Sequence, residues 1–457
     1  MNIVIIGAGQ TGRYLSQVLS NEKCNVVLVD IDRKRLEQAA WSSDIAIKQG
    51  SGTDWQLLDQ FLELSPDLLV ALTSDDATNL VACSIAKNLG YKKTIARVRD
   101  SRYLNRTRLD FGRLFDVDEF ICPELLVANE IYKYMVTPGV FQVETFAHGA
   151  VQLRTILIPT SWRKGNVPIS KLDFPAGMMV GLISRHRTNP HDYTSKGQQE
   201  IIFPHGDDTI LPGDELTLIG ESSVIAEVHS YFGIPERSIK SVVVLGGSRT
   251  AINLAKILSR EDISLRIIEK DPNKCAYLTD LLPKATIINQ DGTSDEVIQN
   301  EKLGQADAFI ASTRSDEVNV MSGLLVKNVG CENVMAQLTS QSYIPIVNRL
   351  GIIHTPSPRI IAANRILAIS LTEAIATLTT LYENQAEIFE IRVSSQSTIT
   401  GIPIAELGPY LPKDFLIAVI QNRGRVMIAN GTRVISPGDT VIVIANPKHR
   451  HELKKIF

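Results

Sequence analysis

The residues that suggest chemistry most directly form a glycine-rich turn close to the start of the chain. The turn follows the apolar run Ile3–Ile6, precedes apolar residues at helical spacing, and consists of Gly7, Ala8, Gly9, Gln10, Thr11 and Gly12. In a Gly-x-Gly-x-x-Gly turn the first glycine permits a tight bend, the second lets a pyrophosphate approach the backbone, and the third permits close helix–sheet packing. Amide groups at the start of the helix favour phosphate. We therefore expect a dinucleotide site at this turn.

An acidic residue ends the next apolar run, Val26–Val29. Asp30 in that position can accept both hydroxyl groups of a ribose, and it repels a 2′-phosphate. NAD(H) is therefore the expected cofactor, in preference to NADP(H). The alternative is a Rossmann turn that has lost its ligand.

Further polar residues follow the predicted strands that border the same crevice. In this topology the carboxyl ends of the parallel strands face the ligand. The residues expected to contact the cofactor from there are Thr53, Thr73, Ser74, Asp75 and Arg97. Asp76 and Asn79 are expected to begin the next helix, because such side chains cap helices. For Arg97 and the neighbouring Arg99, exposure to solvent or ion pairing is an equal alternative.

The same arrangement recurs 239 positions further on, after the apolar run Val242–Leu245. Its candidate ligand-binding residues are Gly246, Gly247, Ser248, Arg249 and Glu269. Ser248 replaces the second glycine, and its Cβ is expected to crowd a pyrophosphate. Arg249 can reach phosphate oxygens through a forked contact, and Glu269 keeps the ribose acceptor. Two interpretations stay open: a mononucleotide or altered dinucleotide site, and a degenerate copy kept for assembly.

The elements that must position these residues also repeat. Short continuous apolar runs alternate with helical patterns in both halves, as expected for strands buried on both faces of a parallel sheet. Beyond them, the pattern predicts helices over 125–135 and 360–381, followed by short strands after Pro-Gly-Asp turns at Pro212 and Pro437. The expected fold class is α/β, with two Rossmann-like, doubly wound parallel-sheet domains, each followed by a small α+β domain.

Composition narrows the classes of function. The chain has 457 residues and a net charge of −3, too balanced to indicate a nucleic-acid partner. Its five cysteines form no Cys-x-x-Cys pair, which fits a reducing compartment. No apolar run reaches the ~18 residues that indicate a membrane span, and the first strand begins too early for a signal peptide. We expect a cytoplasmic protein without a metal site.

The duplication resembles the bacterial Trk-system potassium uptake regulators, the TrkA family, whose chains carry two RCK (KTN) nucleotide-binding domains, each followed by an RCK-C domain. The residues that carry the resemblance are Gly7–Gly12, Asp30, Leu72–Asn79, Ala96–Arg99 and their partners in the second half. It implies the following boundaries: RCK-N domains at 1–117 and 238–355, crossover helices at 118–137 and 356–383, and RCK-C domains at 138–233 and 384–457.

The resemblance also implies ligands and partners. NAD(H) and ATP or ADP are the usual ligands of the family. Its members form a homo-oligomeric ring, expected here to be a tetramer, on the inner face of the cell membrane. The ring gates a potassium-translocating membrane subunit of the TrkH/TrkG type. Arg249 matches a position where some ATP-gated relatives carry an arginine aimed at phosphate.

Three classes of function compete. A gating regulator needs only ligand binding that shifts a conformational equilibrium. An NAD-dependent oxidoreductase needs an acid–base residue facing the nicotinamide, and the chain has no Tyr-x-x-x-Lys pair. Four of its eight histidines are the remaining candidates: His148, His186, His191 and His205. A soluble redox or nucleotide sensor acting on another partner is the third class. We expect a regulator, with no catalytic residue and no enzyme activity.

Overall fold

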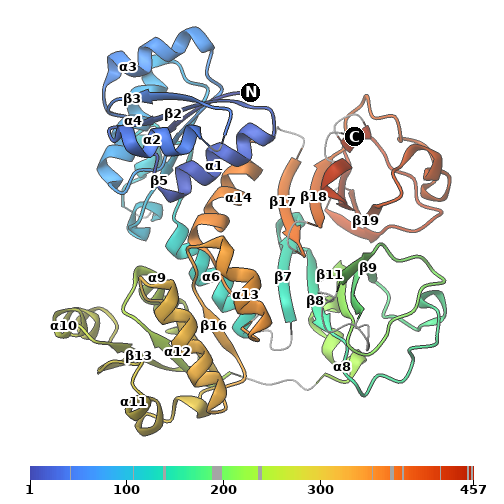
Figure 1. Cartoon of the computed structure of the whole chain (residues 1–457). Helices are drawn as coiled ribbons and strands as arrows, with labels where there is room; N and C mark the ends of the chain where they lie inside the picture. Colours follow the sequence, from blue (N-terminus) through green and yellow to red (C-terminus); the bar gives the residue numbers. More distant parts are fainter. Residues whose placement is uncertain are drawn as a thin grey trace. The chain divides into compact units, whose positions relative to one another are not determined.

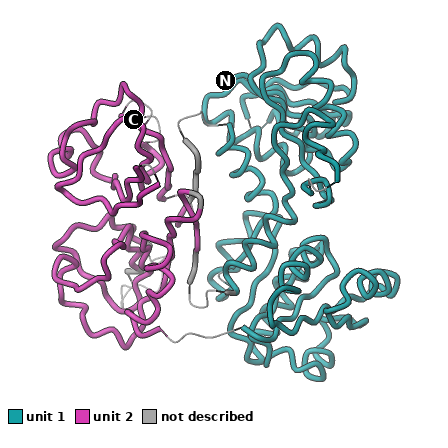
Figure 2. Tube along the Cα trace, turned by 180° about the vertical axis from the view of Figure 1, so that it is seen from behind, with its two compact units in different colours: residues 1–135, 239–370 teal, residues 136–238, 371–457 magenta. Residues whose placement is uncertain are grey.

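The computed structural model describes residues 1–41, 43–105, 108–136, 140–187, 198–234, 239–352, 354–370, 375–382, 385–422, 424–449, 452–453 and 456–457. The chain divides into two compact units, shown in two colours in Figure 2. The first unit combines Met1–Met135 with Ile239–Ser370, and the second combines Val136–Ser238 with Leu371–Phe457. Each unit therefore takes one part from each half of the sequence.

The first Rossmann-like domain contains a parallel sheet with the strand order β3-β2-β1-β4-β5-β6. Reversal of the strand order beside β1 creates the crevice in which such sheets bind ligands. The strands are β1 (Asn2–Ile6), β2 (Asn25–Asp30), β3 (Ala46–Gln49), β4 (Leu68–Ala71), β5 (Lys93–Arg97) and β6 (Glu119–Ile121). The helices are α1 (Gln10–Asn21), α2 (Arg33–Ala40), α3 (Trp55–Gln60), α4 (Asp76–Leu89), α5 (Phe111–Leu114) and α6 (Pro123–Val136).

The second Rossmann-like domain repeats this plan with the parallel order β14-β13-β12-β15-β16. Its strands are β12 (Ser241–Leu245), β13 (Ser264–Glu269), β14 (Ala285–Asn289), β15 (Ala308–Ala311) and β16 (Val334–Ala336). Its helices are α9 (Arg249–Leu258), α10 (Pro272–Leu281), α11 (Asp295–Asn300), α12 (Asp316–Asn328), α13 (Ile344–Arg349) and α14 (Pro358–Ser370). The fold class predicted from the sequence is confirmed.

Local chemistry explains where these helices begin and end. Asp271 accepts the N–H groups of Asn273 and Lys274, and Pro272 occupies the first turn of α10, where its missing N–H costs nothing. Helix α4 ends at Gly90, whose φ of +106° is the left-handed conformation that glycine adopts at helix ends.

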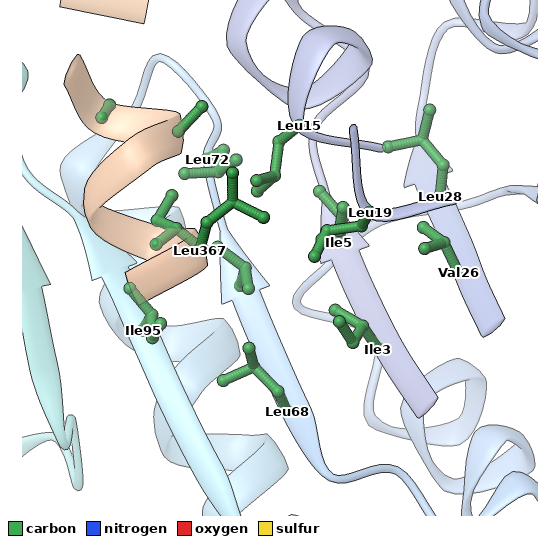
Figure 3. Packing of buried hydrophobic residues seen from close by; sticks show 14 of the residues in the cluster. Ile3, Ile5, Leu15, Leu19, Val26, Leu28, Leu68, Leu72, Ile95 and Leu367 are labelled. Carbon is green, nitrogen blue, oxygen red and sulfur yellow. The ribbon is translucent and has the colours of Figure 1, made fainter. Parts of the chain in front are cut away.

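Helices α6 and α14 are exchanged between the two Rossmann-like domains (Figure 1). Ala363, Ile366 and Leu367 of α14 are buried in the core of the first domain, and Figure 3 shows Leu367 close to Leu15 of α1 and Leu72. Residues of α6 pack in the same way into the core of the second domain: Val127, Ala128, Ile131 and Met135. A buried leucine or isoleucine contributes about 1.5–3 kcal/mol, so each domain depends on a helix from the other half of the chain.

The second unit contains two small antiparallel sheets with the same strand order. Read in the same direction, the orders are β7-β8-β11-β9-β10 and β17-β18-β21-β19-β20. The first comprises β7 (Val140–Phe146), β8 (Val151–Leu157), β9 (Met178–Arg187), β10 (Gln198–Ile202) and β11 (Glu215–Glu221), followed by α7 (Ser222–Ala226) and α8 (Val228–Phe232). The second comprises β17 (Ile375–Leu381), β18 (Ala386–Arg392), β19 (Phe415–Asn422), β20 (Arg425–Ile428) and β21 (Thr440–Ala445). A shared core of residues from both sheets joins the two small domains.

The helix expected over 125–135 is present within α6 (Pro123–Val136), whereas the helix expected over 360–381 is only partly present. The helix expected over 360–381, within the crossover segment 356–383, ends at Ser370, and β17 follows as an edge strand beside β18. The first crossover segment, 118–137, contains strand β6 before α6 begins at Pro123. The error at β17 arises because apolar composition alone does not separate a buried helix from a buried strand.

Candidate functional site

The first glycine turn connects β1 to α1 and has the geometry of a phosphate cradle. Gly7 has a φ of +108°, and a Cβ on Gly12 would lie 1.9 Å from the carbonyl oxygen of Gly7. These two glycines are therefore required by the turn itself. A Cβ on Gly9 would meet no atom within 4 Å. The space beside Gly9 is open, as needed if a pyrophosphate is to lie against the backbone.

The two helix starts differ in how their amide groups are satisfied. Gly9 is the N-cap of α1 and offers no side-chain hydrogen bond. Ser248 is the N-cap of α9, where its Oγ accepts the N–H of Ala251 at 3.1 Å and lies 2.8 Å from the Oγ of Ser312. The first helix start keeps its donors for an anion, whereas the second has an internal acceptor.

The acid of each copy is fixed by the backbone of its own glycine turn. Asp30 accepts the N–H of Ala8 at 2.5 Å and the N–H of Asp32 at 2.8 Å, and it is 9 % exposed. Each carboxylate oxygen can accept a further hydrogen bond. Asp30 therefore holds the glycine turn, and its carboxylate keeps capacity for a further hydrogen bond.

Glu269 repeats this arrangement in the second copy. It accepts the N–H groups of Gly247 at 2.9 Å and Asp271 at 3.0 Å, and the ammonium of Lys274 lies 3.4 Å away. Burial acts to raise the pKa of Glu269, but the two N–H groups and Lys274 together outweigh it, so the pKa lies below its ordinary value. Glu269 is thus ionised in the folded domain at neutral pH.

The residues after β4 are connected mainly to one another. Asp75 accepts the N–H of Thr78 at 2.7 Å as the N-cap of α4, so its carboxylate caps the helix rather than being reserved for a cofactor. Asn79 accepts the N–H and the hydroxyl of Thr73. Asp76 begins α4 as expected, but its carboxylate accepts the N–H of Arg99 at 2.9 Å instead of capping the helix.

Two other predicted contacts also have local partners. The Oγ1 of Thr53 lies 2.9 Å from the Oγ of Ser51. The guanidinium of Arg97, expected near the first crevice, lies 3.4 Å from Glu124 at the start of α6. This pairing turns Arg97 toward the helix that enters the second domain, and it is one of the two alternatives left open by the sequence.

The second glycine turn opens onto a cavity of about 600 Å³, which we call the second crevice. Its walls include all five residues predicted for the second copy, Gly246 among them, and they also include Arg99 and Glu124 from the first half of the chain. Sequence reasoning missed Lys270, Lys274 and Arg314, which add positive charge. A search of the sequence for basic residues close to Glu269 would have found Lys270 and Lys274.

The described residues contain little that suggests other chemistry. No cluster of His, Cys, Asp and Glu able to hold a metal ion occurs among them, and no described helix is long and apolar enough to cross a membrane. None of the five cysteines is in a disulfide, and burial raises the pKa of Cys122 and Cys331 to about 11. His205 is exposed beside Asp208, while the side chains of His148, His186 and His191 lie outside the described residues.

Comparison with known proteins identifies the class. The TrkA-N domain family matches residues 3–123 and 242–358, and the TrkA-C domain family matches residues 166–233 and 388–457. The chain therefore belongs to the TrkA family, with both domains present twice.

Curated relatives match along the full length. Trk system potassium uptake protein TrkA homolog 1 of Methanosarcina mazei is 31% identical over 468 residues and covers 100% of both chains. Trk system potassium uptake protein TrkA of Haemophilus influenzae is 28% identical, covering 100% of this chain and 98% of the relative.

Solved structures confirm the fold. The GsuK RCK domain has a TM-score of 0.60 at 15% identity, covering 100% of this chain and 94% of that one. The GsuK channel bound to NAD has a TM-score of 0.62 at 14% identity, covering 100% of this chain and 78% of that one.

Proposed function

We propose that this chain is a nucleotide-binding regulatory subunit that gates a potassium-translocating membrane protein of the TrkH/TrkG type. NAD(H) is the ligand of the first crevice, and ATP or ADP is a second class of ligand. A nucleotide gates by binding one conformation of the assembly more tightly than another, and couplings of about 1–3 kcal/mol suffice. The observation that carries the proposal is the open cradle at Gly9, within a chain whose four domains all match the TrkA family.

The comparisons support the parts of this proposal unequally. Full-length relatives are named as Trk system potassium uptake proteins, which supports a role in potassium transport. A channel of similar fold has been solved with NAD bound, which supports nucleotide binding to this type of domain. The site residues are proposed from the geometry of the turn: Gly7, Ala8, Gly9, Gln10, Thr11, Gly12 and Asp30.

The assembly is proposed to be a tetrameric ring on the inner face of the membrane. The exchanged helices α6 and α14 already find their partners within one chain, so ring contacts must use other surfaces. Both Rossmann-like domains expose apolar side chains at corresponding helices: Val81, Leu109 and Leu114 around α4 and α5, and Met321, Ile346 and Leu350 on and after α12 and α13. Symmetric closed assemblies bury such repeated patches.

Co-expression with a membrane potassium-translocating subunit tests the role. We expect the two proteins to co-purify, and potassium flux in vesicles to respond to NADH and to ATP or ADP. Gly9→Val should still co-purify, because it alters no apolar surface, but its flux should no longer respond to NADH. Absence of any complex, or a flux response to NADH that is the same in Gly9→Val, would contradict the proposal.

An NAD-dependent oxidoreductase is the competing function. The residues after β4 and β5 are occupied by caps and ion pairs, and His205 is an exposed residue beside Asp208. Steady oxidation of NADH by a small substrate, abolished in Asp30→Asn, would favour this enzyme over a regulator. A nucleotide sensor with another partner would bind NADH equally well but would not co-purify with the membrane subunit.

A further inference from the structure

A second cavity adjoins the second crevice and differs from it in charge. This basic cavity, of about 360 Å³, lies between α9, α10 and the loop Arg99–Arg102 that follows β5. Its walls come from both Rossmann-like domains, and the Oγ of Ser101 donates to the Oδ1 of Asn253 at 3.1 Å across the boundary. The loop and helix α9 therefore meet through a direct contact.

Positive charge dominates the walls of the basic cavity. Its basic residues are Arg99, Arg102, Arg249, Lys256 and Lys274, against one acidic residue, Asp100. Asp100 is already paired with Arg102, which holds the pKa of Asp100 below its usual value. Lys274 lies near Glu269. Within the described part of the chain, neither Arg249 nor Lys256 has an ion-pair partner.

The corresponding surface of the first domain shows that this charge is not a requirement of the fold. Three of the positions 239 residues earlier in the chain are occupied by glutamine: Gln10 is equivalent to Arg249, Gln17 to Lys256 and Gln38 to Tyr277. The loop equivalent to Arg99–Arg102 is Thr339–Ser342, which carries no charge. The equivalents of Ile252 and Lys274 are Arg13 and Arg35, so the first surface carries two basic residues where the basic cavity carries five and one acid. A chain with a net charge of −3 has concentrated cations here.

We propose that the basic cavity binds the phosphate groups of a small molecule that carries at least two of them. Several cations converge there around a single neutralised acid, which favours a polyanion over a single negative charge. The ligand is held by both domains, since Arg99 and Arg102 come from one and Arg249, Lys256 and Lys274 from the other. The half-exposed ring of Tyr277 adds an aromatic wall. This site lies beyond the NAD(H) cradle and does not depend on it.

The consequence is a link between the two Rossmann-like domains. A bound polyphosphate would bridge the loop after β5 to α9 and α10, so it would stabilise their contact. Arg99 also lies 3.9 Å from Glu124 at the start of α6. A ligand that attracts Arg99 therefore competes with Glu124 and acts on the exchanged helix.

The test uses the full chain and inorganic tripolyphosphate in a calorimetric titration at low salt. We expect a single site per chain whose affinity falls about tenfold in Lys256→Gln and in Arg102→Gln, since each removes a charge-assisted contact. Arg35→Gln, at the position equivalent to Lys274 in the first domain, is the matched control and should bind as wild type. Binding should weaken steeply as salt is raised.

This site would be overturned by no binding of tripolyphosphate at millimolar concentration, or by binding that is unchanged in both Lys256→Gln and Arg102→Gln. Loss of binding in Arg314→Gln, with Lys256→Gln unaffected, would place the anion in the second crevice and would also overturn it. NADH affinity is measured on the same variants and should not change. If NADH fails to bind wild type while tripolyphosphate binds as expected, the NAD(H) proposal fails and this one stands.

Discussion

The two glycine turns share a fold but differ in what completes the start of the helix. In the first, Gly9 leaves the amide groups of α1 without a side-chain acceptor, so an external anion can complete it. In the second, Ser248 supplies an internal acceptor, and the adjoining cavity gains Lys270, Lys274 and Arg314. Duplication has thus produced one helix start without a side-chain acceptor and one that has its own. In the second copy, positively charged side chains around the turn supply the attraction for anions that the capped helix start offers less strongly.

The largest effect is expected at the tightest contact of the first turn. Gly12→Ala places a Cβ 1.9 Å from a backbone oxygen of Gly7, which forces α1 away from the sheet. We expect a loss of stability of about 3 kcal/mol, at the upper end for overpacking, together with loss of NADH binding. Chemical denaturation measures it. The equivalent residue in the second copy is already Ala251, so Ala251→Gly should cost only about 1 kcal/mol of helix propensity. Equal costs at both positions would show that the two turns are built alike.

Gly9→Val should abolish the stabilisation of the chain by NADH without unfolding it. The Cβ of the valine would meet no protein atom within 4 Å, and the side chain would occupy the position expected for a pyrophosphate. A ligand at 100 times its Kd stabilises by about 2.7 kcal/mol, and that whole increment should disappear in thermal unfolding. Ser248→Val is the partner variant and should leave the NADH increment intact. A full NADH increment in Gly9→Val would place the cofactor elsewhere.

Exchanging the N-cap residues, Gly9 and Ser248, should partly exchange the ligand affinities of the two turns. Gly9→Ser gives α1 an internal acceptor and should weaken NADH binding several-fold while slightly stabilising the unliganded domain. Ser248→Gly removes the cap from α9, at a cost of a few tenths of a kcal/mol, and should strengthen binding of phosphate-containing ligands to the second crevice. Calorimetry on both variants measures the exchange. If neither variant changes ligand affinity, capping is not what distinguishes the turns.

The smallest effect concerns pH. Because the pKa of Glu269 is depressed in the folded domain, its ionised form contributes stability above the unfolded pKa of 4.5, and this is lost as the pH falls through the folded pKa. Glu269→Gln should therefore show a shallower fall in melting temperature between about pH 5 and pH 3 than wild type. The exposed residue Glu296 is the control, since Glu296→Gln should keep the wild-type slope. If the pH dependence of the melting temperature in Glu269→Gln equals that of the wild type, the charge of Glu269 does not stabilise this turn.

The sequence predicts the local features well because they depend on neighbours in the chain. The apolar runs that become β1 and β4, and the glycines at positions 7 and 12, are recognisable without any tertiary information. The break at Ser370 has a local signal too, because the β-branched residues of Ile375–Leu381 favour a strand. That signal was outweighed by the apolar content of the segment.

Contacts between the halves could not be predicted in the same way. Arg99 and Glu124 line the second crevice only because α6 crosses to the other domain. The capping roles of Asp75 and Ser248 depend on which rotamer the folded turn selects. No spacing in the sequence identifies an exchanged helix, because the apolar face of α14 is the same whichever core it enters.

The helix exchange also determines how the central claim is tested. Residues 1–233 alone would lack α14, and residues 238–457 alone would lack α6, so neither half retains a complete core. The difference between the halves therefore has to be measured in the full chain, with one turn altered at a time.

The most direct measurement is a calorimetric titration of NADH into the full chain, with Gly9→Val and Ser248→Val alongside. The account predicts one tight NADH per chain, lost in Gly9→Val and kept in Ser248→Val, with the second crevice taking NADH weakly or not at all. Two equivalent NADH molecules per chain, or a single site that survives Gly9→Val and disappears in Ser248→Val, would contradict it.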